Sequence, residues 1–391
     1  MIQKYVTTLV LVLLAPLLSA ATIDPIIPAP PQLAATGYLL IDADSKQVLV
    51  EFNSKERLPP ASLTKIMTSY IVAEELDLGV LKGEQEVDVS VKAWRTEGSR
   101  MFIKEGTKVK VGDLMSGVII QSGNDASVAL AEHIAGSEAA FADVMNQQAK
   151  RLGMVDSHFV NATGLPHVDH YTTASDLAKL TIALIKDHPS HYGVYSEKYF
   201  TYNDIRQPNR NTLLWRDKSV DGVKTGHTEE AGYCLVASAE RDNMRLVSVV
   251  MGAQSEEARA AETQKLLTYG FRYYETLRLY QAREALNEVR VWGSARPSVK
   301  LGLAGEVAIT IPRGAKDSLT AAMDIGGVFK APISEGDVMG QLTVSLNAKT
   351  VYQGPLIALG NAAEAGLLQR LWDSLMLFVL QLFSGDPLKV V

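Results

Sequence analysis

The segments that read as β-strands lie at the two ends of a long stretch of this 391-residue chain, and helical patterns fill the middle. Residues 38–41 and 48–50 are apolar runs around a polar turn, which is typical of a hairpin of buried strands. Residues 232–239 and 245–251 are again apolar or alternating, as expected for paired strands. The order predicts an α/β sandwich over residues 38–280, with a sheet that takes strands from both ends.

Between these strands, apolar residues recur at helical spacing. Pro59 and Pro60 cannot lie inside a helix, so the first helix is predicted to begin at or near Ala61 or Ser62. Residues 92–106 are polar and contain glycines, and we expect a surface loop there that could line a cleft. The other predicted helices cover residues 109–120, 126–152, 174–186 and 257–280.

After residue 280 the pattern changes to short alternating segments separated by Gly or Pro, such as residues 299–301, 307–311 and 342–346. This pattern predicts a small all-β domain, most simply a sandwich, over residues 281–361. It contains no group of residues suited to catalysis.

Residues 362–391 form a tail in which a helix is predicted over 362–383. The helix has a broad apolar stripe and a polar side that includes Arg370 and Asp373, but Leu377 and Leu380 fall within the polar side. It is too short and too often interrupted by charge to span a bilayer, and it fits a helix lying in the membrane interface. A helix packed on the β domain is the alternative. The stripe consists of Leu367, Leu368, Leu371, Trp372, Leu375, Met376, Val379, Leu382 and Phe383.

The sequence of the N-terminal segment predicts that the protein is exported from the cytoplasm. Lys4, an apolar run over residues 6–18 and small residues near Ala21 are typical of a secretory signal over residues 1–21, with a membrane anchor as the alternative. The single cysteine, Cys234, cannot form an internal disulfide and is expected to be a buried structural thiol. A net charge of -6 without any basic run argues against nucleic acid as a partner.

Three short motifs occur in one order along the chain. In Ser62-x-x-Lys65 the two residues are three apart, so on a helix they share one face, and a nearby amine is one way to activate a serine. Ser122-Gly123-Asn124 falls in a predicted turn between helices, and Lys224-Thr225-Gly226 falls on or beside a predicted strand. Each motif is common alone, but the ordered set is specific.

This arrangement resembles the penicillin-recognising serine enzymes, whose signature is a serine with its lysine, a second Ser-x-Asn and a Lys-Thr-Gly strand. Gly123 between Ser122 and Asn124 resembles the low-molecular-mass penicillin-binding proteins that act as D-alanyl-D-alanine carboxypeptidases. The resemblance covers nearly the whole mature chain. It implies a serine β-lactamase/DD-peptidase-like catalytic domain at 22–280, the all-β domain at 281–361 and a membrane-anchoring tail at 362–391.

The resemblance also implies roles. Ser62 would be acylated by the carbonyl of the penultimate D-alanine of a peptidoglycan stem peptide, and Lys65 would take the hydroxyl proton. Lys224 with Ser122 would add positive field and relay a proton to the leaving amine, while Asn124 would orient Lys65 and the substrate amide.

The same resemblance places an oxyanion hole at the backbone N–H groups of Ser62 and His227, and lets a substrate backbone pair along the strand at Gly226. Thr225 and Arg259, together with Lys224, match the positions that bind the substrate carboxylate. Arg210 is a weaker candidate, and a surface salt bridge is the alternative for either arginine. The sequence contains no metal-binding motif of the H-E-x-x-H type, so neither a metal nor a cofactor is expected.

Two other activities use the same acylation chemistry: β-lactam hydrolysis and DD-endopeptidase cleavage. A class A β-lactamase deacylates through a glutamate between the second and third motifs. The pattern considered for this role, Glu284-x-x-Asn287, follows Lys224, so β-lactams are expected to act as stable covalent inhibitors. The predicted location is the periplasm, at the outer face of the inner membrane.

Overall fold

The computed structural model describes residues 26–382, so the predicted signal at residues 1–21 and the end of the tail lie outside the described residues. The first region contains the strands β1 (Gly37–Asp42), β2 (Val48–Phe52), β3 (Glu86–Asp88), β4 (Lys108–Lys110), β5 (Tyr199–Tyr202), β6 (Ile205–Pro208), β7 (Val220–Thr228), β8 (Gly232–Arg241) and β9 (Met244–Ala253). Its α-helices are α1 (Lys65–Asp77), α2 (Val91–Arg95), α3 (Val111–Ser116), α4 (Asn124–Ala135), α5 (Glu138–Arg151), α6 (Ala174–Asp187), α7 (Pro189–Tyr192), α8 (Leu213–Arg216) and α9 (Glu256–Tyr273). It also contains two short 3-10 helices, η1 (Ala61–Thr64) and η3 (Gly193–Ser196), and a π-helical turn, η2 (Gly117–Gln121).

The central sheet of this region has the order β2-β1-β9-β8-β7, with antiparallel neighbours throughout. The first two strands come from the start of the region and the last three from its end, which confirms the predicted sandwich. Successive residues of β8 and β9 enter different cores: Val236 faces the helices, whereas Leu235 faces α9. Burial on both faces explains why these strands read as nearly continuous apolar runs.

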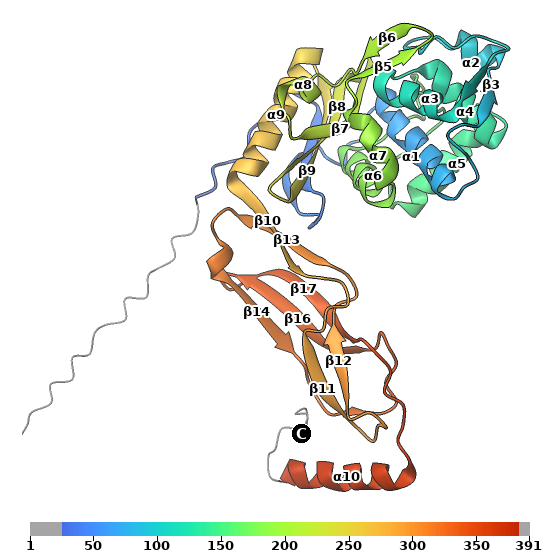
Figure 1. Cartoon of the computed structure of the whole chain (residues 1–391). Coiled ribbons are helices and arrows are strands. Elements are labelled where there is room, and N and C mark those ends of the chain that lie inside the picture. The colour runs from blue at the N-terminus through green and yellow to red at the C-terminus, as the bar shows by residue number, and fades with distance from the viewer. Residues whose placement is uncertain (1–25, 383–391) are drawn as a thin grey trace, which may run out of the picture.

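Helices cover both faces of the sheet (Figure 1). The larger core joins the sheet to α1 and the helices around it, and the smaller core joins the sheet to α9. The predicted helix at residues 174–186 is confirmed as α6, which is capped by the Thr173 side chain accepting from the N–H of Asp176.

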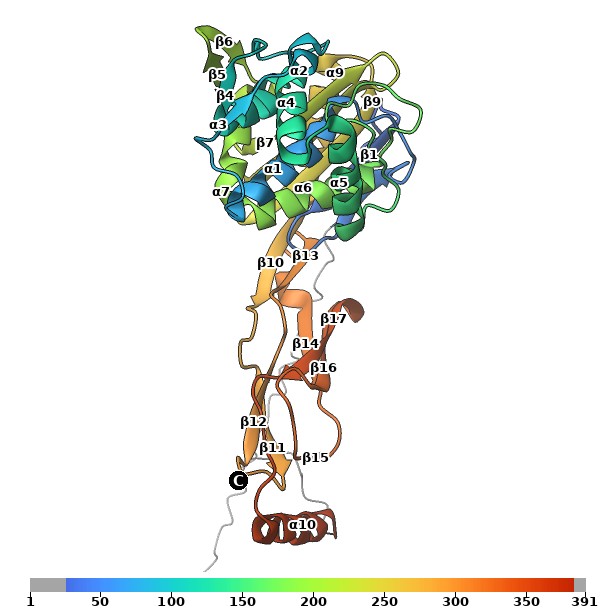
Figure 2. The ribbon, with the colours of Figure 1, turned by 90° about the vertical axis from the view of Figure 1, so that its right-hand side faces the viewer.

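The second region, called the β region below, is rich in β-strands, as predicted, and extends away from the first region (Figures 1 and 2). Its elements are β10 (Tyr274–Tyr280), β11 (Asn287–Trp292), β12 (Ser298–Gly302), β13 (Val307–Pro312), η4 (Lys316–Ser318), β14 (Leu319–Asp324), β15 (Phe329–Lys330), β16 (Val338–Leu346) and β17 (Lys349–Ala358). A six-stranded sheet has the order β14-β16-β17-β12-β11-β15, and β10 pairs separately with β13. The predicted domain limits at residues 21, 280 and 361 stay predictions.

The prediction of helix over residues 257–280 is wrong for its last seven residues, which form the strand β10. Tyr274, Thr276 and Tyr280 favour strands, and the backbone of β10 pairs with β13 instead of continuing α9. The strand also joins the two regions. Thr276 Oγ1 donates to Asp42 Oδ2 (2.6 Å), which lies at the end of β1.

The tail helix α10 (Leu367–Leu382) begins five residues later than predicted, because Ala362 is held by backbone hydrogen bonds to Ile333. Its polar side, not its apolar stripe, faces the β region. Asp373 accepts from the N–H of Gly293 (2.9 Å), and Gln369 donates to the carbonyl of Ser294 (3.1 Å).

Leu377, which interrupts the polar side in the sequence, is buried in this contact. The apolar stripe therefore faces outward over its described length. The helix α10 lies across the end of the molecule that is farthest from the first region (Figures 1 and 2).

Candidate active site

Ser62 lies in η1, the tight turn that leads into α1. The preceding residue, Ala61, has φ +48°, a left-handed conformation that is strained for an alanine. Thr64 Oγ1 donates to the carbonyl of Ala61 (2.8 Å), and Gly164 packs so closely against the same carbonyl that a Cβ there would collide with it. The surrounding chain thus holds the nucleophile turn in one conformation.

Lys65 Nζ lies among three acceptors. It is 3.0 Å from Ser62 Oγ, 2.7 Å from Asn124 Oδ1 and 2.6 Å from the carbonyl oxygen of Thr163. A neutral amine has two N–H donors and one lone pair. If Asn124 and Thr163 accept the two hydrogens, the lone pair points at the Ser62 hydroxyl, which is the geometry that a general base needs.

The environment lowers the pKa of Lys65 to about 7. The main cause is burial, since the side chain is 1% exposed, and the nearby charge of Arg210 adds to it. Asp125 and Glu138 act in the opposite direction. A substantial fraction of Lys65 is therefore neutral near pH 7 and able to accept a proton.

The second motif follows η2 at the start of α4. Ser122 is buried and has φ +66°, which ends the η2 turn and allows the chain to enter α4. Asn124 is fixed on both sides: its Oδ1 accepts from Lys65, and its Nδ2 donates to the carbonyl of Glu97 (2.6 Å). The amide orientation, with its oxygen toward the lysine, is thereby determined.

The third motif lies in the middle of β7, at the edge of the central sheet. Lys224 is 2% exposed and its Nζ donates to the carbonyl of Thr225 (3.0 Å). Burial lowers the pKa of Lys224 well below its ordinary value, and the charges of Lys65, Arg210 and Arg259 lower it further. These basic groups are close enough to act on one another, so each makes the protonated form of the others less favourable.

Gly226 allows β7 to approach the nucleophile turn. A Cβ at this position would lie 3.2 Å from the backbone nitrogen of Ser62 and 3.1 Å from the carbonyl oxygen of Pro60. The next residue, His227, has an exposed side chain that stacks on Tyr233, with ring centroids 4.0 Å apart. Only a glycine brings the backbone of this strand so close to the Ser62 N–H.

Arg259 reaches the same strand from α9. It is 4% exposed, its Nη1 donates to the carbonyl of Gly226 (3.4 Å), and its Nη2 lies 3.4 Å from Glu256. Arg210 is exposed, and no described residue forms a hydrogen bond or ion pair with its guanidinium. The structure thus brings Lys65 and Asn124 together with Ser62, and places Lys224, Arg210 and Arg259 near enough to influence one another electrostatically.

Sequence reasoning missed three supporting groups. The Thr163 carbonyl binds Lys65, although only a turn was recognised at residues 161–166. Asp125 accepts from the backbone N–H groups of Met101, Phe102 and Ile103, so it anchors the loop that Asn124 contacts. His170 is buried, with its Nε2 2.8 Å from Thr64 Oγ1.

Burial lowers the pKa of His170 to about 4, so this histidine is neutral and supports the nucleophile turn. Cys234 is buried as expected, and burial raises the pKa of its thiol to about 11. Among residues 26–382, no cluster of His, Cys, Asp and Glu is suited to hold a metal ion.

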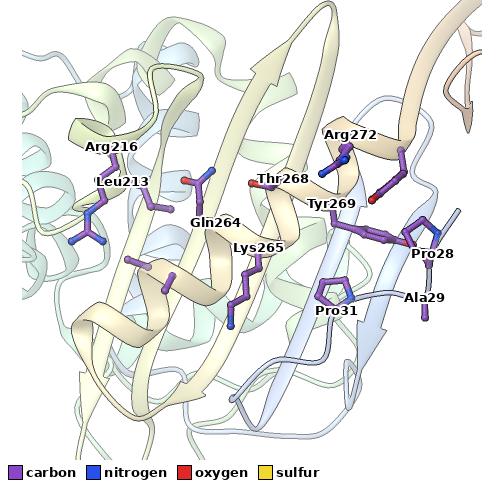
Figure 3. A pocket seen from close by; sticks show the side chains of 13 residues that line it. Pro28, Ala29, Pro31, Leu213, Arg216, Gln264, Lys265, Thr268, Tyr269 and Arg272 are labelled. Atoms are coloured by element: carbon purple, nitrogen blue, oxygen red, sulfur yellow. The ribbon is translucent and has the colours of Figure 1, made fainter.

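A hollow of about 710 Å³ lies away from this site, between the N-terminal arm at residues 28–31 and the outer side of α9 (Figure 3). Leu213, Gln264 and Tyr269 line it, and none of the three motifs contributes a residue. It therefore plays no part in the chemistry of Ser62.

Comparison with known proteins gives consistent results. A family model described as D-alanyl-D-alanine carboxypeptidase matches residues 24–255, and another, described as penicillin-binding protein 5, C-terminal domain, matches residues 274–364. D-alanyl-D-alanine carboxypeptidase DacC of Escherichia coli (strain K12) is 44% identical over 363 residues, covering 91% of each chain. DacA of Haemophilus influenzae is 42% identical over 362 residues, covering 91% of this chain and 92% of the relative. The crystal structure of penicillin binding protein 5 from Haemophilus influenzae has a TM-score of 0.83 at 41% identity and covers 86% of this chain and all of the other.

Proposed function

The chain belongs to the D-alanyl-D-alanine carboxypeptidase family and is a penicillin-binding serine hydrolase, and on that premise we propose which residues perform the reaction. Ser62 attacks the carbonyl of the penultimate D-alanine of a peptidoglycan stem pentapeptide. Lys65 takes the hydroxyl proton. The contact that carries this assignment is Lys65 Nζ at 3.0 Å from Ser62 Oγ, within a site that lowers the pKa of the amine to about 7.

The oxyanion of the tetrahedral intermediate lies between the N–H groups of Ser62 and His227, which the close approach at Gly226 supports. When the intermediate collapses, the C–N bond breaks and the amine of the leaving D-alanine takes the proton, with Ser122 as the relay under the field of Lys224. A water then attacks the ester on Ser62, with Lys65 again as the base, and the shortened peptide leaves.

The terminal carboxylate of the substrate binds at Thr225 and Arg259. Arg259 is held toward β7 by the Gly226 carbonyl, and it is buried enough to make a charge-assisted hydrogen bond strong. Arg210 adds long-range attraction for the anion rather than a defined contact.

Mass spectrometry of the acylated protein tests this assignment. Wild-type protein given a diacyl tripeptide ending in D-Ala-D-Ala should release D-alanine, and brief exposure to penicillin should leave one adduct on Ser62. Ser62→Ala should abolish both signals, whereas Ser69→Ala, a change in the next turn of α1, should retain the adduct. Release of D-alanine by Ser62→Ala at the wild-type rate would refute the assignment.

The penicilloyl adduct is expected to clear slowly. The glutamate pattern at Glu284 lies in the segment between β10 and β11, within the β-rich region, so it cannot supply a deacylating base near Ser62. The carboxypeptidase assignment is therefore preferred over a β-lactamase. A DD-endopeptidase would use the same catalytic residues on a cross-linked peptide.

We also propose that α10 attaches the protein to the outer face of the inner membrane and that it works in the periplasm. Leu371, Trp372 and Leu375 are each more than half exposed, while the polar side of the helix is bound to the β region. No helix within residues 26–382 is long and apolar enough to cross a bilayer. An outward apolar face on a terminal helix fits the interface of a lipid surface.

Vesicle flotation tests the attachment. Because Arg370 is the only cation of the described helix and is paired with Glu364, binding should depend on apolar burial and persist at high salt. Trp372→Asp with Leu375→Asp should abolish flotation, and Ser374→Asp, on the polar side, should leave it intact. Release by salt alone would contradict the proposal.

A further inference from the structure

The hollow of about 710 Å³ beside α9 has the dimensions of a binding site for a small molecule. Its floor is the outer side of α9, where the lining residues run from Ala260 to Tyr273, about 20 Å along a helix (Figure 3). One wall is the N-terminal arm, and Tyr269 holds this arm in place, because its hydroxyl donates to the carbonyl of Pro28 (3.0 Å). The hollow is thus an elongated groove whose wall and floor are joined by a hydrogen bond.

Most of the surface inside the groove is apolar. The arm contributes the rings of Pro28 and Pro31, and the helices contribute Leu213 and Ala261. Ala261 is exposed, so the floor of the groove is open to a ligand. Covering apolar surface that is concave and exposed to water is favourable, so the groove is suited to bind the apolar body of a ligand.

The charged residues of the groove have one sign. Among the described residues that line it, Arg216, Lys265 and Arg272 are basic and none is acidic, although the whole chain has a net charge of -6. Arg216 is already paired with Glu257 (2.8 Å). Lys265 is paired with Glu262 (2.9 Å), so Arg272 is the cation that remains for a ligand.

Arg272 lies near one end of the groove, and Arg216 lies near the other (Figure 3). The exposed guanidinium of Arg272 is 5.5 Å from the ring centroid of Tyr273, and within residues 26–382 it forms no hydrogen bond or ion pair. A guanidinium over a ring keeps its N–H edge free to bind a carboxylate. The groove is therefore complementary to a molecule with an apolar body and one anionic end.

We propose that this groove binds a small amphiphile that carries one carboxylate, with its apolar body along α9 and its carboxylate at Arg272. The inference goes beyond the proposed function, since none of the catalytic residues lines the groove. The source is a dissolved molecule and not a lipid within a bilayer. The reason is that the β region separates α9 from α10, the helix that we propose for membrane attachment (Figures 1 and 2).

Isothermal titration calorimetry with 6-phenylhexanoate and with its neutral amide, 6-phenylhexanamide, tests the inference. The wild type should bind the acid about tenfold more tightly than the amide, as one charge-assisted contact allows. Arg272→Gln should bind the two probes alike. Arg296→Gln is the matched control, because Arg296 is also exposed and its guanidinium has no partner among the described residues, but it lies in the β region. It should keep the tenfold preference.

Two further variants test where the probes bind. Ala261→Trp places a large ring within the groove and should abolish binding of both probes, while D-alanine release from a small peptide stays at the wild-type rate. The apolar stripe of α10 is a second surface that an amphiphile can reach. Trp372→Asp with Leu375→Asp is therefore the control for that surface, and it should bind both probes as the wild type does.

Four results would overturn the inference: no binding of either probe to the wild type, equal affinities of the wild type for acid and amide, unchanged binding by Ala261→Trp, or lost binding in the α10 variant. None of these results bears on the carboxypeptidase assignment. That assignment fails only if the wild type does not release D-alanine, which is measured on the same samples.

Discussion

The first region contains the candidate active site and is called the catalytic region from this point on. It differs from the β region in how many charged side chains it buries. In the catalytic region Lys65, Lys224 and Arg259 are each less than 5% exposed, whereas among residues 274–382 no lysine, arginine, aspartate or glutamate is buried. The β region buries apolar side chains in two small clusters, and its polar buried residues are Thr276, Ser294 and Thr310. Both regions are built on mainly antiparallel sheets, so sheet architecture alone does not explain the difference.

Burying like charges close together costs free energy, and a protein that needed only stability would replace them with apolar residues. In the proposed reaction these groups lower the pKa of the base and act on the reacting carbonyl, which is a reason to retain them. The first region therefore loses some stability where it buries these charges, whereas the β region has no such buried charge within its described residues. Mutations should therefore separate activity from stability in the first region and leave activity unaffected in the second.

Lys65→Met should show the largest separation. Loss of the base is expected to lower the rate of acylation by about 10³-fold or more. The free energy of unfolding at pH 7 should rise by about 1 kcal/mol, because methionine fills the buried site without a charge. The two measurements are the rate of penicillin acylation and urea denaturation.

The pH dependence of these two proteins provides the control. Below about pH 7 the wild-type acylation rate should fall about tenfold per pH unit, since Lys65 must be neutral to act. The unfolded lysine titrates near 10.5 and the folded one near 7, so between these values the unfolded state binds more protons. The wild type should therefore gain stability relative to Lys65→Met as the pH rises from 7 to 10. If the wild type instead lost stability relative to Lys65→Met over this pH range, Lys65 would be charged in the folded protein.

Gly226→Ala should have the next largest effect. Its Cβ would press against the Ser62 nitrogen and the Pro60 carbonyl, pushing β7 away from the oxyanion hole. We expect acylation to fall by about 10²–10³-fold, as for the loss of an oxyanion donor. Gly193→Ala is the matched control, because nothing lies within 4 Å of its added Cβ. Equal rates in both variants would mean that β7 contributes no donor.

Thr276→Val, at the junction with the β region, should have the smallest effect on catalysis. It removes the hydrogen bonds to Asp42 Oδ2 and Thr310 Oγ1, so the free energy of unfolding should fall by about 1–2 kcal/mol. The kcat/KM for a small peptide should stay within about twofold of wild type. Thr320→Val, at an exposed position of β14, serves as the control. A large fall in kcat/KM for Thr276→Val alone would show that the β region influences the chemistry.

The sandwich and a candidate site could be predicted from the sequence because their signals are local. Apolar runs indicated β8 and β9, and the three motifs indicated the residues that we propose for the active site. The error at residues 274–280 arose because the segment follows α9 without a break, and only pairing with β13 reveals a strand. The Thr163 carbonyl was missed for a different reason, since a backbone acceptor has no residue type and its use depends on the turn that Gly164 permits.

The orientation of α10 on the β region could not be predicted from the sequence either. A helical pattern shows which residues share a side, but it does not say which side meets the rest of the molecule. Asp373 and Gln369 decide this through backbone groups of Gly293 and Ser294, which lie about 75–80 residues away along the chain.

The three acceptors around Lys65 have a consequence for the energy of proton transfer itself. In the proposed proton transfer from Ser62, the new ammonium has three N–H donors, and Asn124 Oδ1, the Thr163 carbonyl and Ser62 Oγ already lie at hydrogen-bonding distance from Nζ. No side chain has to turn and no water has to enter when the charge appears. The reorganisation energy of the step is therefore small, because the solvation shell of the product is built into the resting enzyme.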